Sequence, residues 1–161
     1  MTEEIGVKIA ELINDAHLLI PSEPVPDLPS SPYTIGASEW HDFEHKIWKI
    51  GEDIRQLFTK QTVLRSDIHL QAAILDICIA RNAKRGRQSF VSLLGYKSCI
   101  RHAPILVSEI DDPSVEGHII DSLLKMGASQ YINEVRPFVK HETTWIRKKA
   151  ITYCERFGIA E

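Results

Sequence analysis

The chain has 161 residues, of which 43% are hydrophobic and 25% charged, a composition typical of one globular domain with room for a proper core. Its formal net charge is -3, which argues against a protein whose main task is gripping nucleic acid, because such domains are usually basic. No apolar run reaches the roughly 18 residues that a bilayer-spanning helix requires.

The cysteines and the N-terminus indicate a cytoplasmic protein. Cys78, Cys99 and Cys154 form no Cys-x-x-Cys pair, and each falls within an apolar helical pattern. This is typical of small buried hydrophobes in a reducing compartment. The first residues, MTEEIGVK, include two acids and lack the basic segment of a secretory signal.

The first 37 residues predict a helix followed by an arm. Ile5, Ile9, Leu12 and Ile13 follow helical spacing within residues 1–20. Five of the eight prolines then fall between positions 21 and 32, and proline disfavours both itself and the preceding residue in a helix. We expect residues 21–37 to form a linker or arm; a proline-rich ligand for another protein's groove is the alternative.

Residues 38–161 are expected to form a helical-repeat domain that packs as one unit with the N-terminal helix. Its first helix is marked by a seam with spacings of 3 and 4, and Ser38 is a candidate N-cap. The seam comprises Trp40, Phe43, Ile47, Ile50, Ile54 and Leu57. Because it spans fewer than three heptads, we favour packing within the chain over a coiled coil with another chain.

Further helices follow with recognisable ends. Ser66 or Asp67 can cap the next one, and Gly95 closes a helix over about 87–94. Prolines late in two later helices predict a bend or an early end. Other candidate caps are Asp112 with Pro113 behind it, Ser129 and Thr143. No segment alternates with period 2, so we expect an all-α chain of about seven to nine helices.

Residues 111–158 contain an internal repeat with an offset of 31. Val115, Ile119, Leu123, Met126 and Gly127 recur as Ile146, Ala150, Cys154, Phe157 and Gly158. A single unit of this kind cannot bury its own apolar face, so it stacks on a copy of itself.

These units resemble the first helices of HEAT and armadillo repeats. The resemblance rests on DPSV at 112–115 leading to Gly127, and on WIRKKA at 145–150 leading to Gly158. The first unit departs from the family pattern, with Glu116 where arginine is usual. The resemblance covers roughly residues 67–161. It implies an α-α superhelix of antiparallel helix pairs, one face of which binds a large partner.

Charges come in blocks that would form stripes of opposite sign if the helices stack. Residues 77–108 contain no acid but six arginines and lysines, and an acidic group follows immediately. The stripes could steer a charged protein partner, meet nucleic-acid phosphates, or pair within the chain as solvated faces. The expected partner-binding residues are Arg81, Lys84, Arg85, Arg87, Asp111, Asp112, Glu116, Trp145, Arg147 and Lys148.

Catalytic signatures are weak. His41, Glu44 and His45 spell HxxEH, the inverted zinc-protease pattern, but no third ligand is marked. No nucleophile elbow or phosphate loop is present. We therefore expect no cofactor and no catalytic activity.

The favoured hypothesis is a cytoplasmic, non-catalytic protein-binding module. One specific form is a bacterial immunity protein that covers the active site of a toxin encoded by a neighbouring gene. The alternatives are nucleic-acid binding through the basic stretch 81–101 and, least favoured, a metalloenzyme at 41–45.

Overall fold

The computed structural model describes residues 1–30 and 38–158, and this part of the chain is all-α. It contains eight α-helices, four 3-10 helices and no strand, which confirms the predicted fold class. The α-helices are α1 (Thr2–Leu19), α2 (Asp42–Lys60), α3 (Ile68–Cys78), α4 (Gln88–Leu93), α5 (Ala103–Val107), α6 (Glu116–Met126), α7 (Ile132–Val135) and α8 (Thr144–Phe157). The 3-10 helices are η1 (Thr62–Ser66), η2 (Arg81–Arg87), η3 (Lys97–His102) and η4 (Arg136–Lys140).

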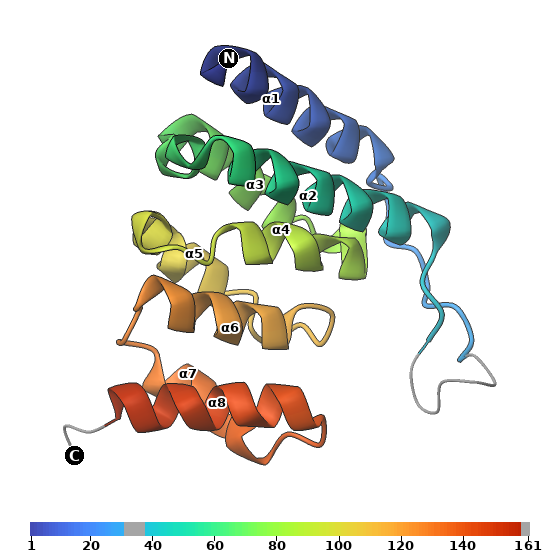
Figure 1. Cartoon of the computed structure of the whole chain (residues 1–161). Helices are drawn as coiled ribbons and strands as arrows, with labels where there is room; N and C mark the ends of the chain where they lie inside the picture. Colours follow the sequence, from blue (N-terminus) through green and yellow to red (C-terminus); the bar gives the residue numbers. More distant parts are fainter. Residues whose placement is uncertain (31–37, 159–161) are drawn as a thin grey trace.

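The helices are arranged as a stack. α1, α2, α4, α6 and α8 follow one another from one end of the molecule to the other, and α3, α5 and α7 lie behind them (Figure 1). Each helix of the first row contacts the next one, and α3 packs on both α1 and α4. The helices therefore lie in successive layers, while the internal repeat and the superhelical arrangement stay predictions.

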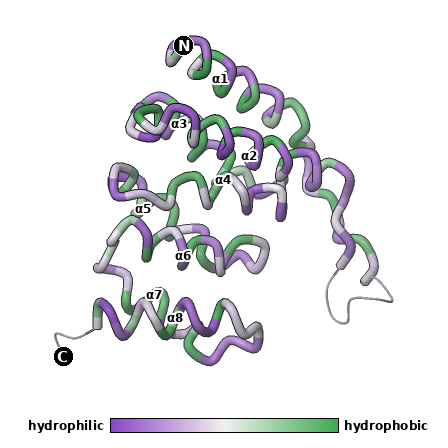
Figure 2. Tube along the Cα trace, in the orientation of Figure 1, coloured by the Kyte–Doolittle hydropathy of each residue, from purple (hydrophilic) through white to green (hydrophobic). Residues whose placement is uncertain are grey.

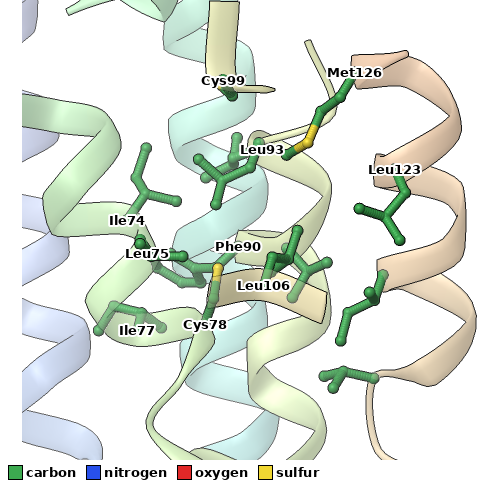
Figure 3. Close-up of a cluster of buried hydrophobic side chains, with 14 of the residues drawn as sticks. Ile74, Leu75, Ile77, Cys78, Phe90, Leu93, Cys99, Leu106, Leu123 and Met126 are labelled. Atoms are coloured by element: carbon green, nitrogen blue, oxygen red, sulfur yellow. The ribbon is translucent and has the colours of Figure 1, made fainter. Parts of the chain in front are cut away.

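Apolar side chains hold neighbouring layers together. Hydrophobic and hydrophilic residues alternate along most helices (Figure 2), so each helix has one face for the core. In the middle of the stack, Ile74 and Cys78 of α3, Phe90 of α4, Leu106 of α5 and Leu123 of α6 gather in one cluster (Figure 3). A layer removed from this stack would expose the apolar faces of both neighbours.

The seam of α2 packs within the chain, as predicted. The fully buried residues of α2, however, lie on a helix face that is rotated slightly from the seam. Ile47 and Ile54 are buried as expected, whereas the other buried positions are Glu44, Gly51 and Phe58. The seam residues between them are only partly buried. The reason is that α2 lies between α1 on one side and α4 and η2 on the other, which widens its buried face.

Helix starts were predicted with mixed success. Asp67 caps α3 through bonds from the backbone N–H groups of His69 and Leu70. Ser38 does not cap α2, which begins after His41; the His41 N–H donates to Glu44 Oε2 at 2.7 Å. The Ser38 hydroxyl oxygen instead accepts from Arg85, a distant partner that local spacing cannot reveal.

The later caps also differ from expectation. Asp112 accepts from the Ser114 N–H at 2.9 Å in a turn, and α6 begins only at Glu116. α7 begins after Tyr131 rather than Ser129, and Thr143 occupies the N-cap position of α8 without a side-chain cap bond. Short turns that hydrogen-bond to themselves displace these helix starts by a few residues.

Both late prolines mark a change of helix type. η3 gives way to α5 at Ala103, one residue before Pro104, and α7 gives way to η4 at Arg136, one residue before Pro137. A proline lacks the N–H that would continue the preceding hydrogen-bond ladder, so each helix breaks at the same place relative to its proline. The predicted irregularity is therefore present in both segments.

α6 and α8 are neighbours in the stack. Val115, Ile119 and Leu123 are buried, as are Ile146 and Ala150, but Cys154 is only partly buried. Gly127 ends α6 in the left-handed region, with φ +74°, where glycine is favoured. Gly158 has φ -93°, so the two glycines end their helices in different ways.

Two further expectations can be compared with the described residues. Cys78 and Cys99 are buried free thiols, and burial raises the pKa of both. Among residues 1–30 and 38–158, no helix combines the length and apolar character that crossing a membrane would need.

Candidate interaction surface

The basic segment η2 turns inward rather than forming a free stripe. Arg87 is 0% exposed, and its guanidinium donates to Glu109 Oε1 at 3.1 Å and to Asp112 Oδ2 at 2.6 Å. It also donates to the carbonyls of Cys78 and Lys84. The expectation that Arg87 meets a partner is therefore wrong, because a side chain without exposed surface offers no contact.

The acidic block that follows is the counterpart of this arginine. Arg81 donates to Glu109 and to Asp111 Oδ1 at 3.0 Å, with half of its side chain exposed. Burial alone would raise the pKa of Asp112, but the Ser114 N–H and the Arg87 guanidinium outweigh burial and lower it. Arg81, Arg87, Asp111 and Asp112 thus form one intramolecular network, and only its outer members reach solvent.

The remaining cations of η2 hold the arm. Lys84 pairs with Asp27, and Arg85 donates to Glu44 and to the carbonyls of Ser38 and Glu39. Lys84 has φ 52° and ψ -133°, a positive-φ conformation that a non-glycine residue adopts only under constraint. The arm on either side of residues 31–37 is therefore fastened to the stack by the two basic residues that were expected to face a partner.

The HxxEH stretch is used structurally. Glu44 is fully buried and accepts from the Arg85 N–H at 3.0 Å, while the His41 ring bonds to the Pro26 carbonyl at 2.9 Å. Within residues 1–30 and 38–158, no three His, Cys, Asp or Glu side chains form a group that could hold a metal ion. His41 thus holds the arm, and Glu44 stabilises the start of α2.

The C-terminal candidates lie around the junction of α6 and α8. Glu116 pairs with His141 at 2.6 Å, and Arg147 donates to the His141 carbonyl at 2.8 Å. Trp145 is 42% exposed, and its ring makes an edge contact with His118 at 5.1 Å. Glu116 and Arg147 therefore support the loop before α8, while Trp145 keeps an accessible face.

A pocket opens among three successive helices of the first row. This central pocket, of about 240 Å³, is lined by Trp48, Glu52, Arg55, Gln88, Ser89, Ser92 and His118. They come from α2, α4 and α6, and the contact between His118 and Trp145 adds α8. Burial lowers the pKa of His118, which favours a neutral ring there. The pocket therefore combines aromatic rings with an exposed Arg55–Glu52 pair.

A second depression lies at the end of the stack. This C-terminal basic groove, of about 380 Å³, is lined by Asp121, Leu124, Lys125, Lys148, Lys149, Thr152 and Arg156. Asp121 is shared by Lys125 and Lys149, each at 2.9 Å. Burial alone would raise the pKa of Asp121, but the two lysines outweigh it and lower the pKa. Four cations and this one carboxylate line the groove, so the groove is strongly positive.

Sequence reasoning found only part of these two sites. It selected Trp145 and Lys148 but missed Trp48, His118 and Arg156. One local signal was present: positions 48, 52 and 55 repeat at helical spacing beside the seam of α2. The helices that lie opposite these three positions are set by the tertiary stacking, which no local sequence pattern predicts.

Comparisons of the chain with protein-family models, curated proteins and solved structures gave no match. The resemblance to HEAT and armadillo repeats therefore stays a prediction.

Proposed function

We propose that the protein is a non-catalytic module that binds another protein through the central pocket and the aromatic surface beside it. The observation that carries the proposal is the convergence of Trp48, Arg55, His118 and Trp145 on neighbouring helices. Tryptophan and arginine are the residue types most enriched among side chains that dominate binding energy. A HEAT-like stack would present them on one rigid surface.

A specific form of the proposal is an immunity protein acting in the cytoplasm. Such a protein would block a toxin by covering its active site, and the toxin would be encoded by a neighbouring gene. The buried free thiols suit a reducing compartment. The pocket suits a protruding side chain of the partner better than a whole small-molecule substrate, because it is below the usual volume of ligand sites.

The test is binding of the purified chain to the product of the neighbouring gene, measured by isothermal titration calorimetry. We expect a 1:1 complex that Arg55→Glu weakens by about tenfold or more, since the substitution reverses a charge at the pocket rim. Arg101→Glu on η3 is the matched control, because Arg101 is exposed and lies outside the pocket. Equal affinities for the two variants would contradict the proposed surface, and no complex would remove the immunity form.

Nucleic-acid binding is the second candidate, and the C-terminal basic groove is what favours it. The stretch 81–101 supports it less, because Arg81, Lys84, Arg85 and Arg87 all pair with carboxylates of the chain. Affinity for an oligonucleotide that falls steeply with salt would support this function. No binding at low salt would exclude it. A metalloenzyme at 41–45 draws no support from the arrangement of Glu44.

A further inference from the structure

The two ends of the stack carry opposite charge. α1 forms one end and α8 the other (Figure 1). α1 contains four carboxylates and one lysine, whereas α8 contains four arginines and lysines and one carboxylate. The overall charge of -3 conceals this asymmetry, because the formal charges of the two helices cancel each other.

The outer side of α1 has no partner within the described chain. Ile9, Ile13 and Ala16 face inward. The opposite side bears three carboxylates and one cation beside Val7, which is 55% exposed, and these charged residues are Glu4, Lys8, Glu11 and Asp15. These residues line two shallow depressions along the helix. Among the residues described, none hydrogen-bonds or ion-pairs with those three carboxylates.

The other end offers the complementary groups. In the C-terminal basic groove, Lys125 and Lys149 are held by Asp121, but Lys148, Thr152 and Arg156 have no side-chain partner in the described part of the chain. These three follow one another at intervals of four on α8, so they form a line along the helix. Ile151, 37% exposed, provides an apolar group next to that line.

The two lines are of comparable length. Glu4 to Asp15 spans about 16 Å along a helix axis and Lys148 to Arg156 about 12 Å. We propose that α1 of one copy packs on α8 and the C-terminal basic groove of a second copy, so that the protein self-associates head to tail. The occupant of the groove is thus the acidic side of α1, with carboxylates meeting Lys148 and Arg156 and with Val7 near Ile151.

The geometry of the stack sets the form of the assembly. Because α1 and α8 lie at opposite ends (Figure 1), two copies cannot satisfy both contacts at once. A contact between unlike surfaces that does not close leads to chains of increasing length. The central pocket is made by other residues, so this proposal stands apart from the proposed function.

The first measurement is sedimentation velocity of the nucleic-acid-free chain over a range of concentrations. At about 0.05 M salt we expect the average mass to rise continuously with concentration. At about 1 M salt, where the screening length is only about 3 Å, it should return to the single-chain value of 18.3 kDa. A single-chain mass at every concentration would overturn the proposal, and so would a mass that levels off at two chains.

Charge reversal at each end tests the contact itself. The acid-reversed variant carries Glu4→Lys and Glu11→Lys, and the base-reversed variant carries Lys148→Glu and Arg156→Glu. These side chains are exposed and lack partners among the described residues, so circular dichroism should show unchanged folding. Each variant alone should stay monomeric, because its two ends then carry the same charge.

Mixing the two variants provides the decisive control. Each end of the acid-reversed variant is then complementary to an end of the base-reversed variant, so an equimolar mixture should regain concentration-dependent association. Association of either variant alone at the wild-type level, or a mixture that stays monomeric while the wild type associates, would show that these end charges do not form the contact.

Discussion

At the scale of single residues, Arg87 is a buried charge that depends on its hydrogen-bond partners. It is fully buried and connects α3, η2 and the turn before α6 through Cys78, Glu109 and Asp112. A buried ion pair is weak grounds for stability in itself, but removal of one member leaves an uncompensated charge behind. The network therefore fixes the relative positions of α3, η2 and the turn before α6. Apolar contacts alone are less directional and would leave these positions less well defined.

Arg87→Met should lower the free energy of unfolding by about 3 kcal/mol or more, because Asp112 would lose its arginine and Glu109 one of its two arginines, while both carboxylates stay largely shielded from water. Arg81→Met is the matched control in the same network. Arg81 is half exposed, so its loss should change stability by about 1 kcal/mol or less. Urea denaturation followed by tryptophan fluorescence measures both. Similar losses of stability in the two variants would show that the burial of Arg87 does not make its ion pairs more important than those of Arg81.

At the scale of helices, close approach depends on small residues at particular positions. A Cβ at Gly51 of α2 would lie 2.0 Å from Ser89 Oγ and 2.7 Å from Ser89 Cβ. Gly117 of α6 likewise leaves room for the ring of Trp145. Glycine lowers helix propensity, so its presence in these helices reflects packing between layers.

Gly51→Ala should destabilise the protein by about 1–3 kcal/mol, because α2 and α4 would have to move apart. Gly6→Ala in α1 is the matched control, since its nearest neighbour would be Leu64 Cδ2 at 3.6 Å. Relief of the glycine penalty there should stabilise the fold by about 0.5–1 kcal/mol. Thermal or urea unfolding gives the sign of each change, and a stabilising Gly51→Ala would contradict the close approach of α2 and α4.

At the scale of the whole molecule, carboxylates and histidines together set the response to acid. The pKa of Asp27, Asp112 and Asp121 is lowered from 3.8 in the folded chain. Folding is therefore favoured by these groups above pH 3.8, and that contribution is lost as pH falls below it. Burial lowers the pKa of His102 and His118 from 6.5, so their protonation also disfavours the folded state.

We expect the free energy of unfolding to fall in two steps on acidification, the first below about pH 6.5 and the second below about pH 4. Urea denaturation at a series of pH values measures this profile. Asp112→Asn should reduce the second step and leave the first in place, because the histidines remain. A second step that is unchanged in this variant would show that Asp112 does not contribute to it.

The sequence by itself determined the helical class and most apolar positions of the core, while the predicted arm over residues 21–37 lies in part, at 31–37, outside the described residues. Val115, Ile119 and Leu123 predict a buried stripe, because helical periodicity can be read from residues that are close in the sequence. The same locality offered Ser66 or Asp67 as the cap of α3, of which the structure uses Asp67, and it marked the helix changes near Pro104 and Pro137.

Only the tertiary structure determined which charged side chains pair with one another. Arg87 lies 25 residues from Asp112, and Lys84 lies 57 residues from Asp27, so no spacing rule could pair them. A run of arginines and lysines has the same sequence pattern whether it faces solvent or a folded chain. Only the stacking of layers shows that η2 turns inward, and only that stacking brings Lys125 and Arg156 to one groove and Trp48 and His118 to one pocket.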